Sequence, residues 1–283
     1  ISCSLVGSEM CIRDRVYTNV TEHVKIGDAP ADFQRLAPSF TVSLQPWQEQ
    51  LLFLRLMYKS TFRMPTFNDL YYYRLGNRSL RPEKANEYNM GITWSRSFSS
   101  FLNYLSVTVD GYYNDVTDKI VAFPTTYAWK MANYGKVHVT GMDATLAAAA
   151  SLGKNMVLVV SGGYTWQKAI DLTDATSKSY KDQLPYTPKH SGNVSAVLEM
   201  PWVNVGYSIV GVSERYSMSQ NIPENRIDGY MEHTASLSRN FSFRHCKLRL
   251  QAEIINMTDT QYDVIKYYPM PGRSWRLTGT IEF

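Results

Sequence analysis

The last ten residues, "SWRLTGTIEF" (274–283), alternate between two kinds of side chain until the chain ends. One side of an extended strand would carry Trp275, Leu277, Gly279, Ile281 and Phe283. The other side would carry polar or charged residues. A period of two is the spacing of a strand with one apolar and one polar face. The final segment therefore predicts an amphipathic β-strand that ends on an aromatic residue.

The same period recurs along most of the chain, whereas the helical period is hard to find. In "KLRLQAEI" (247–254) Leu, Leu, Ala and Ile alternate with Lys, Arg, Gln and Glu. Ordinary globular strands have about five or six residues, but a strand that crosses a bilayer needs about 9–11. Most strands expected here have 10–15 residues, which favours membrane-spanning strands. The eleven expected strands are 36–45, 50–60, 86–98, 103–116, 134–150, 155–168, 187–200, 203–216, 229–242, 246–257 and 272–283.

The connections between these strands alternate between short and long. Turns of a few residues follow the odd-numbered strands, and long connections follow the even-numbered ones at 61–85, 117–133, 169–186, 217–228 and 258–271. Bacterial outer-membrane barrels have short periplasmic turns and long extracellular loops. The predicted fold class is therefore all-β, an antiparallel up-and-down transmembrane β-barrel.

Aromatic residues reinforce this interpretation, since they make up 13% of the 283 residues and include 20 tyrosines. They gather near both ends of the expected strands, as interfacial girdles do. The set expected at the long-loop end is Tyr112, Tyr134, Trp166, Tyr186, Tyr216, Tyr230 and Trp275.

Composition argues against several other classes. The net charge of +4 is mild and no basic run occurs, so nucleic-acid binding finds no support. The chain contains no run of 18 apolar residues, so no transmembrane helix is predicted. The five histidines are scattered and no catalytic or cofactor-binding motif occurs, so neither an enzyme nor a cofactor is expected. Asp171 and Asp174 offer too few oxygen ligands for calcium, and no metal site is expected.

The segment "ISCSLVGSEMCIRDR" (1–15) lacks any periodicity. It resembles the translated sequencing-adapter sequence that contaminates the ends of metagenomic assemblies. We expect residues 1–15 to be such an artefact. The domain would then occupy residues 16–283.

Two stretches carry a more specific pattern. "STFRMPTFNDLYYYRLGNRSLRPEKANEYNMGITW" (60–94) and "IINMTDTQYDVIKYYPMPGRSWRLTGTIEF" (254–283) together resemble TonB-dependent receptors. The matching positions in the first stretch are Phe62, Arg63, Pro65, Asp69, Leu70 and Tyr71, then Gly76, Asn77, Leu80, Pro82 and Glu83. Those in the second are Asn256, Asp259, Tyr262, Pro269, Pro271, Gly272 and Arg273. We expect these residues to shape loops and barrel, with Pro65 and Pro82 ending strand pairing and Gly272 allowing tight entry into the last strand.

The resemblance implies a barrel of about 22 strands with a plugged lumen, so the chain would be its C-terminal half, a fragment without the plug domain. It also implies a receptor in the outer membrane of a Gram-negative bacterium that takes up a scarce, bulky nutrient with energy from TonB. A ferric siderophore or cobalamin is favoured over haem, because "TFNDLYYYRLG" (66–76) has no histidine. The expected partners are TonB, through the missing N-terminal region, the barrel-assembly machinery, outer-membrane lipid and lipopolysaccharide.

The resemblance also suggests site residues. Loop aromatics suited to stacking on a flat ligand, and equally to loop packing, are Tyr71, Tyr72, Tyr73, Tyr127, Trp129, Tyr267 and Tyr268. The closing residues Trp275, Leu277, Ile281 and Phe283 look like the signal read by the barrel-assembly machinery. Two other classes stay open: a passive outer-membrane porin, although eleven is an odd strand count, and a secreted β-sandwich adhesin.

Overall fold

The structure is a computed structural model of the whole chain. The parts that it describes are residues 2–5, 8–11, 16–18, 33–35, 37–47, 51–73, 75–99, 101–124, 129–153, 155–243 and 246–282. Most of these residues belong to long β-strands, as the sequence predicts.

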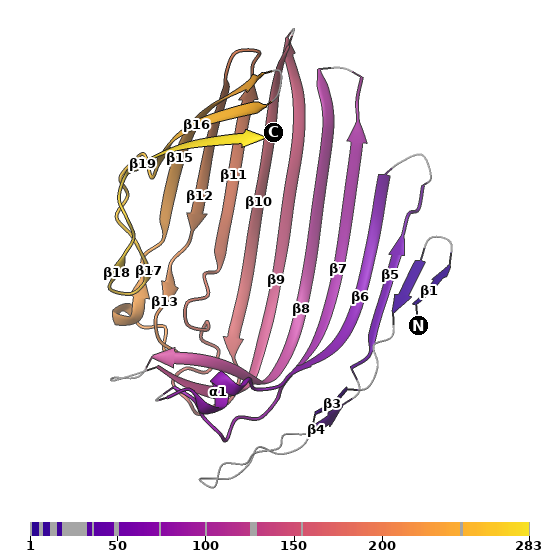
Figure 1. Cartoon of the computed structure of the whole chain (residues 1–283). Coiled ribbons are helices and arrows are strands. Elements are labelled where there is room, and N and C mark those ends of the chain that lie inside the picture. The colour runs from indigo at the N-terminus through magenta and orange to yellow at the C-terminus, as the bar shows by residue number, and fades with distance from the viewer. Residues whose placement is uncertain are drawn as a thin grey trace.

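Eleven antiparallel strands form one curved sheet, in which each strand pairs with the strands before and after it in the meander (Figure 1). They are β5 (Ser39–Leu44), β6 (Leu51–Arg63), β7 (Glu83–Ser97), β8 (Leu102–Pro124), β9 (Trp129–Gly153), β10 (Met156–Asp171), β11 (His190–Glu199), β12 (Asn204–Val212), β15 (Tyr230–Ser242), β16 (Lys247–Ile255) and β19 (Ser274–Glu282). The edges are β5 and β19. The predicted up-and-down order is confirmed. A β-sandwich would need two packed sheets, so that alternative is wrong.

The largest difference from the sequence prediction is the length of β8 and β9. The sequence predicts a loop between them, but pairing continues from Lys119 opposite Tyr134 to Pro124 opposite Trp129. The segment "KIVAF" (119–123) is rich in β-branched and apolar residues that favour an extended chain. This hairpin therefore continues past the length that a bilayer requires.

The long connections contain short elements of their own. These are α1 (Phe67–Tyr71), β13 (Arg215–Tyr216) paired with β14 (Arg226–Ile227), the 3-10 helix η1 (Pro223–Asn225), and β17 (Asp263–Ile265) paired with β18 (Tyr268–Pro269). Near the start, β1 (Ser2–Leu5) pairs with β2 (Ser8–Cys11), and β3 (Val16–Thr18) pairs with β4 (Phe33–Arg35). The artefactual origin of residues 1–15 stays a prediction. Among the described elements, no helix has the length and apolar character needed to cross a membrane.

The strand register separates the two faces of the sheet. Leu248 of β16 lies opposite Phe241 of β15 and Ile281 of β19. The next residue, Arg249, lies opposite Thr280. Large exposed side chains on the apolar face include Met90, Ile92, Leu146, Val194, Tyr207, Met231, Leu237, Leu250 and Leu277. Since so wide an apolar surface requires hydrocarbon around it, this face is the one that lipid covers and the polar face lines the lumen.

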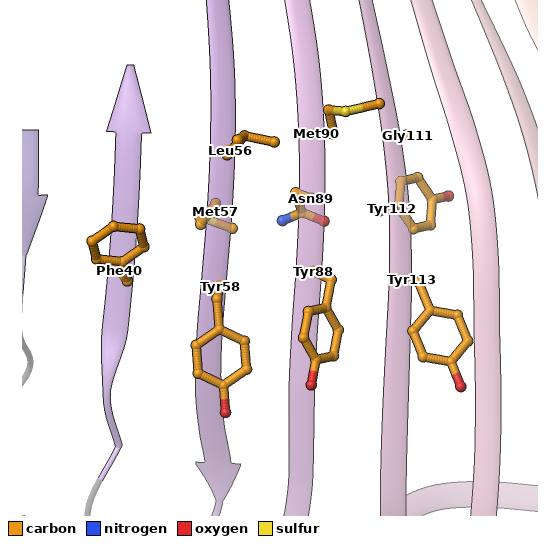
Figure 2. Close-up of a pocket in the computed structure, with 10 residues that line it drawn as sticks. All are labelled: Phe40, Leu56, Met57, Tyr58, Tyr88, Asn89, Met90, Gly111, Tyr112 and Tyr113. Carbon is orange, nitrogen blue, oxygen red and sulfur yellow. The ribbon is translucent and has the colours of Figure 1, made fainter. Parts of the chain in front are cut away.

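The aromatic belt of the apolar face differs from the predicted girdle. Tyr112 and Tyr230 were expected in that girdle, but the register turns both toward the polar face. On the apolar face, Tyr88 instead lies opposite Tyr58 and Tyr113, with ring centroids 5.1 and 6.2 Å away. Figure 2 shows the three rings side by side, with their hydroxyls toward the same strand end. Phenols at one level, with the polar tip toward the loops, are typical of a membrane interface.

The buried core lies near the long-loop end rather than at the middle of the sheet. One cluster contains Val116, Val137, Val139, Ala169 and Leu184. A second contains Leu70, Leu80, Ile120 and Met131. These clusters pack the connections after β6 and β10 against the β8–β9 hairpin, so the outer loops are held in place by apolar burial.

Candidate functional site

The connection between β6 and β7 is shaped by one buried carboxylate. Asp69 accepts a hydrogen bond from Arg63 Nη2 at 3.0 Å and from the backbone N–H of Thr66 at 2.9 Å. The Thr66 hydroxyl in turn accepts from the Asp69 N–H at 3.2 Å, which completes a capping box at the start of α1. Because Asp69 is occupied within its own loop, this part of the sequence pattern orders the chain, as expected.

The same connection is attached to the β8–β9 hairpin. Asn77 Nδ2 donates to the carbonyl of Met131 at 3.1 Å, and Glu83 Oε2 accepts from the N–H of Ile120 at 3.1 Å. At Gly76 an added Cβ would lie 2.7 Å from the Leu70 backbone, so the chain passes too closely for a side chain. Strand β6 ends before Pro65 and β7 begins after Pro82, as the sequence predicts.

The final connection is built around Asn256, which is only 1% exposed. Its Nδ2 donates to the carbonyl of Thr260 at 2.9 Å, and its Oδ1 accepts from the Thr260 N–H at 2.9 Å. Asp259 Oδ1 accepts from the N–H of Arg273 at 2.8 Å. A Cβ at Gly272 would lie 2.5 Å from that oxygen, so the glycine is needed because Asp259 approaches so closely.

One buried arginine joins two outer loops. Arg215 of β13 is 4% exposed, and its Nη2 donates to the backbone carbonyls of Asp263 at 2.5 Å and Val264 at 3.0 Å. Its guanidinium carbon lies 5.8 Å from the centroid of the Tyr230 ring. Lys266 Nζ donates to the carbonyl of Glu224, which makes a second link between the same loops. The connections after β12 and β16 therefore form one layer.

Aromatic rings stack within this outer layer. Trp129, at the tip of the β8–β9 hairpin, stacks on Tyr186 with ring centroids 6.3 Å apart. Tyr230 stacks on Tyr262 at 3.9 Å, and the Tyr262 hydroxyl donates to Glu232 Oε2 at 2.6 Å. Burial, followed by the hydrogen bond and negative charge of Glu232, raises the pKa of Tyr262. These faces could contact a bulky ligand while their polar edges stay bonded to the loops.

Below the loops, the polar face forms a hydrogen-bonded wall. Arg55 Nη2 and Asp110 Oδ1 lie 2.8 Å apart, bridging over β7 at Gly91. A Cβ at Gly91 would overlap the Asp110 carboxylate, so glycine opens the space for this pair. Across β16 and β19, Arg276 Nε lies 2.5 Å from Glu253 Oε2. The wall therefore presents charge to a lumen rather than to lipid.

The tyrosines and tryptophan predicted to contact ligand lie in three separate connections. On α1, Tyr71 stacks on Phe67 at 6.1 Å, and Tyr72 and Tyr73 follow it at the exposed surface. Tyr267 and Tyr268, in the β17–β18 turn, are 82% and 69% exposed. Trp129 lies at the hairpin tip.

The structure adds residues that the sequence prediction missed. Tyr186, the partner of Trp129, was assigned only to the girdle, and Arg215 was not singled out. Both are joined to their partners by contacts between residues far apart in sequence, so no local signal marks them. Tyr127 and Phe283 lie outside the described residues, and Trp275, Leu277 and Ile281 share the apolar face of β19.

Asp171, the last residue of β10, and Asp174, in the connection after it, both accept hydrogen bonds from that connection. Asp174 Oδ1 accepts from the Thr176 hydroxyl at 2.7 Å and from its N–H at 2.8 Å. These bonds, first the hydroxyl and then the backbone one, lower the pKa of Asp174. Asp171 likewise accepts from the Thr173 N–H at 2.9 Å. In the described part of the chain, no group of three His, Cys, Asp or Glu residues could hold a metal ion.

The chain is similar to known proteins in sequence and in fold. The family model described as "TonB dependent receptor-like, beta-barrel" matches residues 13–257. The vitamin B12 transporter BtuB of Photobacterium profundum is 25% identical over 230 residues, which are 78% of this chain and 34% of that protein. This chain therefore spans about a third of the length of that relative.

Two solved structures share the fold. The ferric-catecholate import receptor Fiu from K12 E. coli matches with a TM-score of 0.64 and 20% identity, over 88% of this chain and 35% of that one. The copper transporter OprC matches with a TM-score of 0.69 and 14% identity, over 89% of this chain and 40% of that one. At such identities the likeness concerns the fold of the barrel wall.

Proposed function

Because this chain belongs to the β-barrel family of TonB-dependent receptors, we propose that it forms part of a receptor that imports a bulky, metal-containing nutrient. A ferric siderophore or cobalamin is the proposed cargo. Members of this family are transporters of the Gram-negative outer membrane and not enzymes, so the apolar face belongs in that membrane. The family also favours TonB-driven uptake over the passive porin that the sequence left open.

The observation that carries the cargo proposal is the aromatic layer over a polar lumen. The Trp129–Tyr186 and Tyr230–Tyr262 stacks lie in loops that Arg215 and the β8–β9 hairpin hold together. Aromatic ring faces bind large, rigid molecules by burying apolar surface area, and a few polar groups then fix the orientation of the bound molecule. The names of similar proteins mention vitamin B12, a ferric catecholate and copper, which supports a metal-containing cargo as the common class.

We also propose that the chain supplies the C-terminal part of a larger barrel. Its eleven strands cover about a third of the length of curated relatives, and the sheet has two edges, β5 and β19. In lipid the backbone groups of such edges need partners, because each unsatisfied group costs several kcal/mol. Further strands would close the wall, and contact with TonB would come through a plug that those relatives' additional length can accommodate.

An uptake assay tests this proposal. The full-length gene is placed in Gram-negative cells that lack their own receptors, with and without TonB. Radiolabelled cobalamin and a panel of labelled ferric siderophores are then supplied. TonB-dependent accumulation of one of them is expected. Accumulation that is equal without TonB would refute active transport, and a lack of TonB-dependent accumulation of every metal-containing cargo supplied would refute the cargo class.

A further inference from the structure

A hollow of about 520 Å³ lies on the polar face of the sheet. It extends over β9, β10, β11 and β12, which stand side by side in the middle of the curved sheet (Figure 1). The side chains of Asp143, Thr165, Ser191 and Asn193 line it around Gly163. Because Gly163 has no side chain and most of its neighbours are small, the wall of the lumen is recessed at this point.

The strand register connects this hollow to the aromatic layer of the outer loops. Ser191 lies opposite Thr165 on β10 and Val212 on β12. Val212 in turn lies opposite Tyr230 on β15, which stacks on Tyr262. The hollow is therefore continuous with the surface that is proposed to contact the cargo.

Asp143 brings a carboxylate into the hollow without a counter-ion. It lies directly opposite Asp110 of β8, whose Oδ1 is paired with Arg55 Nη2 at 2.8 Å. No ion pair or hydrogen bond joins the Asp143 side chain to another residue in the described part of the chain. Like charges that lie directly opposite each other destabilise a sheet. A cation or hydrogen-bond donor bound at Asp143 would offset that cost.

The lumen wall at this level is negative as a whole. Two rows of lumen-facing residues, aligned by the register from β6 to β15, contain the hollow, and their charged side chains are Arg55, Asp110, Asp143 and Glu232. Three carboxylates thus face one guanidinium. Arg215 of the outer loops is only 4% exposed and donates to backbone carbonyls, so its charge is shielded from a molecule in the lumen.

The remaining polar groups of the hollow can both donate and accept hydrogen bonds. Thr165 and Ser191 carry hydroxyls, and Asn193 carries an exposed amide. The Asp143 carboxylate accepts from N–H and O–H groups and repels anions. A ligand with amide groups offers both N–H donors and C=O acceptors, so it matches this set of side chains.

We propose that the hollow is a lumen site for the cargo, in which Asp143 accepts hydrogen bonds from amide N–H groups and selects a neutral or cationic, amide-bearing metal chelate over a polyanionic one. This inference rests on the proposed import function and narrows its cargo class. Continuity with the aromatic layer supports the cargo as the occupant. The negative wall supports the charge preference.

Competition binding to the full-length receptor tests the charge preference. The probes are cyanocobalamin, which is neutral and carries peripheral amides, the cationic amide-bearing complex ferrioxamine B, and a ferric tris-catecholate complex with a strongly negative charge. We expect one of the amide-bearing probes to bind about tenfold more tightly than the tris-catecholate, or better. Tighter binding of the tris-catecholate would overturn this inference and leave the import of a metal-containing cargo intact. Failure of all three probes to bind would contradict the import proposal as well.

A pair of charge-removing substitutions tests the role of Asp143. Asp143→Asn keeps the size of the side chain and should lower the ratio of the two affinities, amide-bearing probe over tris-catecholate, by about tenfold. Glu199→Gln is the matched control, because it removes a carboxylate from the same face at the short-turn end of β11, and it should change the ratio by less than about twofold. An unchanged ratio in Asp143→Asn, or an equal change in both variants, would refute the selective role of Asp143.

A thiol in the hollow distinguishes the cargo from the plug as its occupant. Asn193→Cys and the control Thr278→Cys, on the lumen face of β19, both replace exposed polar side chains, so both variants should fold. In a background without other reactive cysteines, each is labelled on cells with a membrane-impermeant maleimide. The bound amide-bearing probe should slow labelling at position 193 by about tenfold and leave the control unchanged. Labelling at position 193 that ignores the probe would refute the site. A thiol that stays unreactive without the probe would assign the hollow to the plug instead.

Discussion

Replacing Arg215 by methionine should release the outer loop layer while leaving the barrel wall folded. The side chain is 4% exposed, and Nη2 bonds two backbone carbonyls, at Asp263 and Val264. Hydrogen bonds from a charged donor contribute about 1.5–3 kcal/mol each. Among the described residues, the Nη1 atom of Arg215 is buried without a hydrogen-bond partner. Burying that atom costs about 1–3 kcal/mol of stability, which offsets part of the stabilisation from the two Nη2 bonds. The net loss on substitution is about 3 kcal/mol.

Hydrogen–deuterium exchange on the full-length receptor measures this loss locally. A loss of about 3 kcal/mol corresponds to roughly 100-fold faster opening of the loop segments. Peptides that cover β17 and β18 should show it, whereas peptides from β10 should not.

The matched control is Arg226→Met in the paired strand β14. Arg226 is exposed, and its partners Asp228 and Glu214 lie at the surface at 2.9 and 3.3 Å. Exposed ion pairs contribute little, so exchange should change by less than about threefold. If both variants exchange alike, or if Arg215→Met leaves the loops as protected as the wild type, the loop-clamp role of Arg215 is refuted.

Three further results are expected of the full-length receptor. Gly91→Ala should reduce the yield of heat-stable barrel because the new Cβ overlaps Asp110, and adding Asp110→Gly should restore the yield; a double variant as poor as the single one would contradict the steric explanation. Leu250→Lys, on the apolar face, should cost about 2–4 kcal/mol of folding free energy in vesicles, whereas Gln251→Lys should cost far less; equal costs would overturn the face assignment. The raised pKa of Tyr262 means that its protonated phenol still donates above the ordinary tyrosine pKa, so its stabilising bond persists there and is lost only when pH passes the raised value. Tyr262→Phe should remove one tyrosine ionisation from the region above the ordinary tyrosine pKa in a spectrophotometric titration, and a titration that is unchanged in that region would disprove the assignment.

The strand order was accessible from sequence because each membrane strand must show one face to lipid and one to the lumen. Because of that requirement, apolar and polar residues alternate along each strand with a period of two. The alternation of short turns and long loops then indicates that neighbouring strands run in opposite directions in sequence order. The orientation of individual aromatics was less accessible. In "YY" (112–113) the two rings face opposite sides, and a register shift of one residue would exchange them. The outer part of the β8–β9 hairpin was missed because it pairs beyond the bilayer, where no such pattern is imposed.

Only the residues of the site that order the loops were predictable from sequence. The two stretches that resemble the receptor family, 60–94 and 254–283, contain residues whose polar groups bond inside their own loops, such as Asp69 and Asn256. These bonds are local in sequence. The stacks and the Arg215 clamp join residues far apart in sequence, which a pattern in one sequence does not reveal. Tertiary contacts therefore decide which aromatics pack and which stay at the surface.

The difference between loop residues that are bonded within the loop and loop residues that are exposed explains how one barrel scaffold could serve different cargoes. Where a residue such as Asp69 or Asn256 has its hydrogen bonds satisfied within a loop, changing it would disorder the loop before it changed cargo recognition. Exposed side chains on the same loops carry no such cost. Tyr72 and Tyr267 are 59% and 82% exposed at the surface of different connections. Cargo contact is therefore expected from such exposed side chains and from the Trp129 stack, while residues such as Asp69 and Asn256 keep the loops in the positions from which these side chains can reach a ligand.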